Sequence, residues 1–191
     1  MSESSPLLAL SMTEALVVVA PFSNAFIKDW PPEHYRQLIE LCVERGGVRA
    51  IVVGTSGQRE LGNQIIRALP APAVENRCGT MSWLELGALI DGSAAVVGND
   101  SGVAHLAATR GARTICIFGG SKSVFEWMAR GPRVVVLQKR TSCSPCAIHH
   151  HSGCPYQKRC LSEISPEQVF SELANYLDPS TGRQPAQIAA G

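Results

Sequence analysis

The sequence has little charge and no long apolar run. Charged residues make up 17% of the 191 residues, and the formal net charge is +1. A surface that binds nucleic acid needs a clear excess of cations, so we expect no nucleic-acid partner. No apolar stretch approaches the roughly 18 residues that a membrane-spanning helix needs, so we expect no transmembrane segment. The first cation is Lys28, whereas an export signal begins with basic residues, so we expect a cytoplasmic protein.

Three common signatures of nucleotide-binding and hydrolytic enzymes are also missing. Without a G-x-x-x-x-G-K-[ST] loop, a phosphate-loop NTPase is excluded. Without a G-x-G-x-x-G turn after the first apolar run, a dehydrogenase is disfavoured. Without a G-x-S-x-G elbow, Ser101 is not predicted to be a hydrolase nucleophile.

What is present is a regular alternation of short apolar runs and amphipathic helical patterns. This alternation predicts an α/β fold in which helices cover both faces of a parallel sheet, and right-handed crossovers make it Rossmann-like. We predict strands at 16–20, 50–53, 73–74, 94–97, 114–118 and 134–137. We predict helices after Pro31, around Leu61, Ile65 and Leu69, over 82–90, from Ser101, and over 165–177. The domain is expected at 13–178, between a flexible lead at 1–12 and a flexible tail at 179–191.

The most informative stretch runs from Gly98 to Ala107 and joins a buried strand to a helix. The carboxyl ends of parallel strands are where α/β proteins bind ligands. The free N–H groups at the start of the helix, with Gly102 allowing close approach, suit an anion. Asp100 adds an acceptor for a hydroxyl-rich ligand, and His105 lies about one turn further on. We therefore predict a ligand site here; the alternative is a helix that Asp100 or Ser101 caps and that binds nothing.

Small and polar residues also follow other predicted strands, and the carboxyl ends of parallel strands share one edge of the sheet. Lys28 is predicted to reach a phosphate, Ser56 to contact a ribose, and Met81 to pack on a base. The alternatives are a solvated lysine, a turn cap and a core methionine. The expected pocket residues after these strands are Ser23, Asn24, Lys28, Ser56, Met81 and the turn at 119–121.

A loop at 141–161 is rich in cysteine and histidine. Thiols and imidazoles so close together predict a structural zinc site as one alternative, although only the first cysteine pair has the spacing of a common zinc module. The other alternative is a loop of reduced, locally packed thiols. The candidate ligands are Cys143, Cys146, Cys154 and Cys160, with His149, His150 and His151 between them. The remaining cysteines, Cys42, Cys78 and Cys116, lie in apolar patterns and are expected in the core.

Four segments together resemble glycosyltransferase family 9, the ADP-heptose:lipopolysaccharide heptosyltransferases and their relatives. They are residues 23–31, 79–86, 99–107 and 118–119, and their order and spacing match from about Val17 to Leu177. The resemblance implies the nucleotide-sugar-binding, C-terminal half of a GT-B enzyme. It implies inverting transfer of heptose or a related sugar, from an ADP-linked donor to a lipopolysaccharide-type acceptor, without a required cofactor.

The resemblance also implies roles for single residues. Lys28 would lie near the donor phosphates, and Met81 near the adenine. His105 would support the loop or reach the ligand. The residues implied to line or meet the phosphates and sugar are Ser23, Asn24, Asp100, Ser101 and Gly102.

The chain departs from the family pattern in two respects. Its first predicted strand begins near residue 16, which leaves no room for an acceptor-binding half. The family's general base comes from that half, so we assign no catalytic residue. We therefore expect an acceptor-binding domain or partner chain, a lipid-linked saccharide acceptor, and a peripheral position at the inner membrane. The second departure is the neutral pair Thr55 and Ser56, where some relatives place a carboxylate for the ribose.

Two other functions stay open at this point. One is a nucleotide-sugar-binding protein without catalysis, which would bind nucleotide but have no acceptor half. The other is a zinc-binding interaction protein, in which the loop at 141–161 is the functional surface. Tight metal binding without a nucleotide pocket would favour the last alternative.

Overall fold

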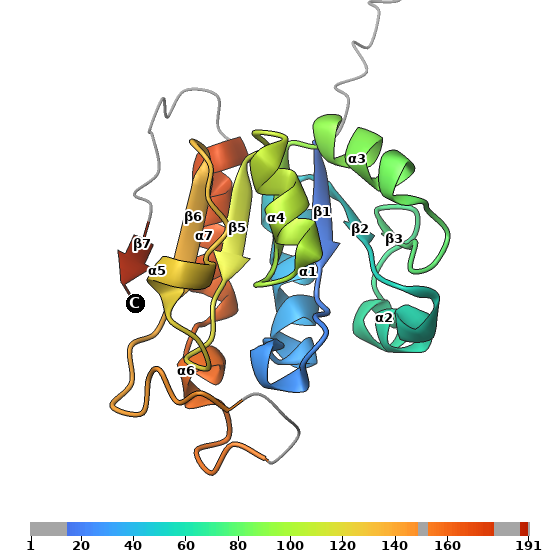
Figure 1. Ribbon diagram of the computed structural model, residues 1–191. Helices are drawn as coiled ribbons and strands as arrows, with labels where there is room; N and C mark the ends of the chain where they lie inside the picture. The colour runs from blue at the N-terminus through green and yellow to red at the C-terminus, as the bar shows by residue number, and fades with distance from the viewer. Residues whose placement is uncertain (1–14, 149–152, 178–187, 191) are drawn as a thin grey trace, which may run out of the picture.

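A parallel seven-stranded sheet lies at the centre of the computed structural model, which describes residues 15–148, 153–177 and 188–190 (Figure 1). The strand order is β3-β2-β1-β4-β5-β6-β7. The strands are β1 (Leu16–Ala20), β2 (Arg49–Val52), β3 (Val74–Asn76), β4 (Ala95–Asn99), β5 (Thr114–Ile117), β6 (Val134–Gln138) and β7 (Ile188–Ala190). The predicted Rossmann-like parallel sheet is confirmed.

The order of the strands reverses direction at β1, which pairs with both β2 and β4. Chain order runs outward from β1 through β2 to β3, and then continues on the other side from β4 to β7. A crevice forms at such a switch point because the connections leave β1 and β4 in opposite directions. The fold therefore creates a place for a ligand beyond the carboxyl ends of these two strands.

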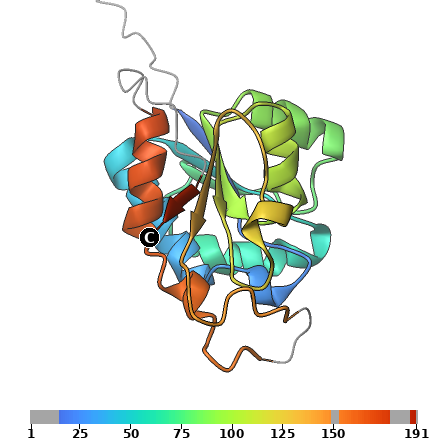
Figure 2. The same cartoon turned by 60° about the vertical axis from the view of Figure 1, so that its left-hand side comes forward.

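Helices cover both faces of the sheet, as Figure 2 shows from the side. Successive side chains of a strand point to opposite faces. Val17 and Val19 of β1 pack in the cluster with α1, α2 and α7, whereas Val18 and Ala20 pack with α3 and α4. The helices are α1 (Pro32–Gly46), α2 (Arg59–Ile66), α3 (Trp83–Asp91), α4 (Gly102–Thr109), α5 (Val124–Trp127), α6 (Arg159–Ser162) and α7 (Pro166–Leu177). Two short 3-10 helices are η1 (Phe26–Lys28) and η2 (Ser56–Gln58). Across the described ranges, none of the helices has the length and apolarity that a bilayer crossing requires.

Local sequence signals explain where the longer helices begin and end. Pro32 begins α1, where its missing N–H costs nothing, and Gly47 ends the helix in the left-handed conformation at φ 57°. Ser82 and Glu85 form the predicted capping box of α3, since each side chain accepts a backbone N–H of the other residue. These ends hold the loops that follow the strands in place.

The second predicted helix differs from expectation in two residues. Leu61 is half exposed, and Leu69 lies beyond the end of α2. The reason is that Gly62, not Leu61, faces the sheet: a β-carbon at Gly62 would lie 2.7 Å from the side-chain nitrogen of Asn76. Gly62 and Ile65 are the buried residues of α2.

The C-terminal residues correct one boundary. Residues 179–191 are predicted to be a flexible tail, but Ile188–Ala190 within it form β7 in parallel pairing with β6. The outer edge of β6 presents backbone N–H and C=O groups, and any extended segment can pair with them. This explains why β7 forms there. The expected lead at 1–12 and the rest of the tail lie outside the described residues.

Candidate functional site

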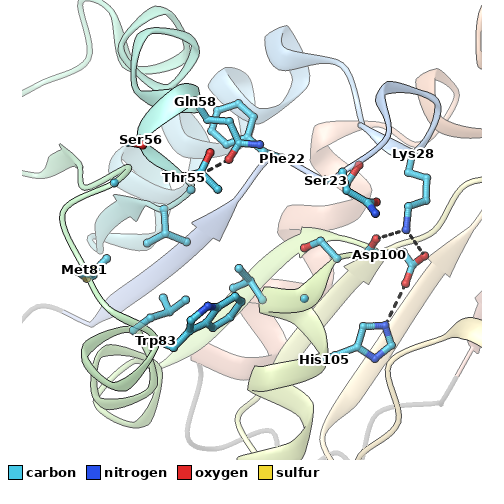
Figure 3. Close-up of a pocket in the computed structure, with 18 of the residues that line it drawn as sticks. Phe22, Ser23, Lys28, Thr55, Ser56, Gln58, Met81, Trp83, Asp100 and His105 are labelled. Carbon is cyan, nitrogen blue, oxygen red and sulfur yellow. Dashed lines mark hydrogen bonds and ion pairs between the residues drawn. The ribbon is translucent and has the colours of Figure 1, made fainter. Parts of the chain in front are cut away.

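A cavity of about 660 Å³ lies at the carboxyl ends of β1, β2 and β4, at the switch point of the sheet (Figure 3). Loops from five elements meet there, so residues distant in sequence share one wall. All nine residues predicted for the donor site line this cavity. They are Ser23, Asn24, Lys28, Ser56, Met81, Asp100, Ser101, Gly102 and His105.

Lys28, Asp100 and His105 form a charged chain along one wall (Figure 3). The Lys28 ammonium donates to the Asp100 carboxylate at 2.9 Å and to the Asp100 carbonyl oxygen at 2.8 Å. The other carboxylate oxygen of Asp100 lies 3.2 Å from Nε2 of His105. The Asp100 side chain is 6% exposed, the Lys28 side chain 20% and the His105 side chain 46%. The buried carboxylate thus fixes a cation and an imidazole at the cavity wall.

A second polar layer lies behind this wall and centres on Asn99. The Asn99 amide oxygen accepts from the Trp30 backbone N–H at 3.0 Å and from the Tyr35 hydroxyl at 2.8 Å. Its amide nitrogen donates to the Pro21 carbonyl at 2.7 Å and to the Asp29 carboxylate at 3.2 Å. Asn99 therefore ties the loop after β1 to the end of β4, which sets the position of Lys28 relative to Asp100.

Asp29 completes this layer. Burial raises the pKa of its carboxyl above the ordinary value, and the hydrogen bond from the Ser23 hydroxyl, at 2.6 Å, opposes that shift. Ser23 is therefore occupied by the protein itself, as a support of the loop that carries Lys28. Because Ser23 also lines the cavity, a contact between Ser23 and the ligand stays a prediction.

The start of α4 forms the floor between these charged groups. Ser101 is the N-cap residue, yet its side chain makes no capping hydrogen bond. Its hydroxyl oxygen is buried without a hydrogen-bond partner. The predicted cap by Asp100 or Ser101 is thus wrong, because the Asp100 carboxylate turns to Lys28 and His105 instead. The first-turn N–H groups of α4 lack a side-chain acceptor, which suits an anionic ligand.

The opposite wall has no charged side chain and combines apolar with small polar residues. Met81 packs partly against the core cluster of α3 and also lines the cavity. Thr55 caps η2 in place of Ser56, and its backbone N–H donates to the Gln58 side chain at 2.8 Å. Gly79 has φ 70°, and a β-carbon there would lie 2.3 Å from the Cα of Ser56, so only glycine allows these two loops to meet. This wall suits a flat, weakly polar group.

Two tryptophans at the cavity were not among the predicted site residues. Trp83 is 67% exposed and Trp127 is 53% exposed, and both line the cavity. Their rings come from α3 and α5. The capping box around Trp83 predicts where a helix starts and says nothing about ligand binding. Trp127 lies in no motif that would point to a binding role. A β-carbon on Gly102 would lie 3.4 Å from the Trp83 ring, which explains the close approach of α3 to α4.

The turn at 119–121 was expected near this pocket, but it packs elsewhere. A β-carbon on Gly120 would meet the hydroxyl of Ser144, and the Gly120 backbone N–H lies 3.3 Å from the Cys160 sulfur. This turn therefore supports the cysteine loop and is not part of the cavity wall.

The four cysteines of the loop lie near one another in its described part. Within the described ranges, no group of three or more His, Cys, Asp and Glu side chains could hold a metal ion. Burial raises the pKa of the Cys160 thiol, and the thiols of Cys154, Cys143 and Cys146 raise it further. The histidines at 149–151 lie outside the described residues.

The sequence of the chain matches a known family over most of its length. The family model described as glycosyltransferase family 9 (heptosyltransferase) matches residues 3–158. The chain belongs to glycosyltransferase family 9. Within this family, the lipopolysaccharide heptosyltransferase 1 of Pseudomonas aeruginosa is 30% identical over 172 residues, which cover 82% of this chain and 46% of that protein.

Solved structures from the family share the fold. The E. coli ADP-heptose lipopolysaccharide heptosyltransferase II superposes with a TM-score of 0.72 at 24% identity, covering 88% of this chain and 48% of that one. An E. coli heptosyltransferase solved with ADP superposes with a TM-score of 0.66 at 21% identity, covering 85% and 44%. This family 9 chain thus spans about half the length of the relatives it matches, and its fold is one Rossmann-like half of a GT-B fold.

Proposed function

We propose that this family 9 chain binds the nucleotide-diphosphate-sugar donor of a heptosyltransferase in the cavity between β1 and β4. The observation that carries the proposal is the pairing of Lys28 with the uncapped start of α4 on one cavity wall. A cation beside converging N–H groups suits the two phosphates of a diphosphate. The buried, unpartnered hydroxyl of Ser101 adds a donor at the same place.

The opposite wall and the relatives support a proposal for the identity of the donor. One neighbouring structure holds ADP, and another is named for ADP-heptose. Met81 and the exposed ring of Trp83 offer an apolar surface for a base. We propose an ADP-linked heptose or a related sugar as donor, and a lipid-linked, lipopolysaccharide-type saccharide as acceptor.

The chemical contribution of this half is to hold the donor and to stabilise its leaving group. In an inverting transfer, an acceptor oxygen bonds to the anomeric carbon while the bond from that carbon to the diphosphate oxygen breaks. The negative charge that grows on the diphosphate would be met by Lys28 and the N–H groups of α4. The acceptor proton must pass to a base, and Asp100 is poorly suited because Lys28 and His105 already engage its carboxylate. The base is therefore assigned to the acceptor-binding half.

The test of donor binding is calorimetry with ADP. Loss of the Lys28 charge by Lys28→Ala should weaken ADP binding by about 10- to 100-fold, the range expected for a charge-assisted contact to phosphate. Asp100→Ala should also weaken it, because Lys28 then loses its anchor. Arg67→Ala, which removes a cation outside the cavity, is the matched control. Equal ADP affinity in all three folded variants would contradict the placement.

Metal binding by the cysteine loop is a separate question, and we predict that the loop thiols are free. Four thiols should then react with a thiol reagent in purified protein, and a chelator should leave the melting temperature unchanged. The reason is that, among the described residues, no three His, Cys, Asp or Glu side chains are grouped so that they could hold a metal ion. About one zinc per chain, with a lower melting temperature after chelation, would establish the structural zinc site instead.

A further inference from the structure

We propose that the surface at the carboxyl ends of β5 and β6 binds an anionic lipid bilayer. This basic–aromatic surface consists of the segments 122–130, 139–148 and 156–160, together with Phe26. It is distinct from the donor cavity, which it touches at Trp127. The proposal does not depend on the donor that the cavity takes.

The charge of the chain is distributed very unevenly. Between Lys122 and Cys160 the sequence has seven Lys and Arg residues and a single acid, Glu126, whereas the whole chain has 17 basic and 16 acidic residues. Of those seven cations, Arg133 lies just before β6 at the other edge of the sheet. The other six belong to the basic–aromatic surface. Within these three segments cations outnumber acids by six to one, whereas the chain as a whole is near neutral.

Contacts link these segments to one another or, for 122–130, to the turn that precedes it. The Arg159 guanidinium donates to the Ser142 hydroxyl at 3.2 Å, and the Cys146 backbone N–H donates to the Gly120 carbonyl at 2.9 Å. The Lys158 ammonium donates to the backbone oxygen of Phe26 at 3.1 Å. Figures 1 and 2 show the same arrangement: the loop after β6 and α6 lie together below the lower end of the sheet.

Exposed aromatic rings sit beside the cations of this surface. Lys122 lies 5.3 Å from the Trp127 ring centre, Arg159 lies 5.2 Å from that of Tyr156, and Lys158 lies 3.8 Å from that of Phe26. The three rings are each more than half exposed, as is Phe125. These four are most of the seven exposed large apolar side chains over the described ranges.

This combination fits a bilayer surface better than a small anion. Aromatic rings with one wet edge are favoured in the headgroup region, and Lys and Arg beside them meet the lipid phosphates. The cations are spread over three segments and do not converge on one cavity, whereas a free phosphate or saccharide would need convergent donors. Because Trp127 belongs to both the surface and the cavity wall, a bound bilayer would lie close to the mouth of the donor cavity.

The experiment is co-sedimentation of the full chain with vesicles. We expect binding to vesicles of phosphatidylcholine mixed with phosphatidylglycerol, little binding to phosphatidylcholine alone, and a loss of binding at high salt. Each cation removed should weaken binding about fivefold, so Lys139→Gln with Arg140→Gln should weaken it by about 20-fold or more. Phe125→Ser should also weaken it, because the exposed ring is lost.

Matched controls test whether binding depends on this surface or only on the total charge and apolarity of the protein. Arg45→Gln with Arg67→Gln removes two cations outside the surface, and Leu84→Ser removes an 83% exposed apolar side chain from α3. Both controls should bind vesicles like the parent, and all variants should keep their ADP affinity and melting temperature. Equal losses in test and control variants, equal binding to both vesicle types, or full competition by a soluble polyphosphate would each overturn the proposal. None of these results depends on ADP binding, so the donor proposal stands or falls separately.

Discussion

Asn99 makes four hydrogen bonds with its side-chain amide, and all four reach the loop after β1 or the helix that follows it. It is fully buried. No apolar residue could replace these bonds, since each partner would be left in the interior without an acceptor or donor. Asn99 is thus a positioning residue for the wall that carries Lys28.

Replacing this amide should cost much of the stability of the fold. We expect Asn99→Ala to lower the free energy of unfolding by about 2–4 kcal/mol, because it leaves buried groups of Trp30, Tyr35 and Pro21 unpaired. Urea denaturation measures the change. Asn24→Ala, at an exposed position after the same strand, should change it by less than about 0.5 kcal/mol. A similar, small effect for both would show that the amide bonds contribute little.

At this scale the sequence predicted where polar residues gather but not what they bind to within the protein. Asp100 and Lys28 could be placed on one edge because they follow two parallel strands. Their ion pair could not be predicted, because the two residues are 72 positions apart and either could have faced a ligand alone. The role of Asn99 was missed for the same reason, although it begins the motif that was singled out.

The strands are the elements that were easiest to predict. Runs such as Leu16–Ala20 are short, apolar and β-branched, which is typical of a strand buried on both faces. The short helices η1, α5 and α6 were not predicted, since three or four residues are too few to display a helical period. β7 was missed because its pairing depends on β6, 52 residues earlier in the sequence, and not on its own composition.

The pairing of β1 with β4 has a testable requirement at Gly98. A β-carbon there would lie 2.8 Å from the carbonyl oxygen and 2.9 Å from the β-carbon of Ala20 on the neighbouring strand. We expect Gly98→Ala to destabilise the protein by about 1–3 kcal/mol, because backbone must move to admit it.

The control for this substitution is Gly57→Ala. A β-carbon at Gly57 would find its nearest neighbour at 4.0 Å, so we expect a change of less than about 0.5 kcal/mol. Thermal or urea unfolding of the two variants gives the comparison. If Gly98→Ala were as stable as Gly57→Ala, the strands would have to be further apart than the structure has them.

For the whole molecule, the main expectation concerns what one half of a GT-B fold can do alone. Transfer needs donor, acceptor oxygen and base in one geometry, and that positioning supplies much of the rate. We expect this chain to bind ADP but to transfer sugar poorly, and to gain transfer when an acceptor-binding half is added in cis or in trans. An assay with an ADP-sugar donor and a lipid-linked acceptor measures this. Efficient transfer by the chain alone, abolished by His105→Ala, would mean that the base lies in this half.

The pair of Lys28 and Asp100 holds the cation at the cavity wall and leaves part of its hydrogen-bonding capacity for a ligand. The ammonium gives two of its three N–H bonds to Asp100, at 2.9 and 2.8 Å, so a ligand can accept the third without displacing the carboxylate. A single phosphate group can make only that one contact with Lys28. A diphosphate can contact Lys28 with one phosphate while the other meets the N–H groups of α4, and so it need not displace Asp100 at all. The wall would therefore act as a filter for the number and spacing of charges, which favours diphosphates over the phosphate monoesters that are abundant in any cell.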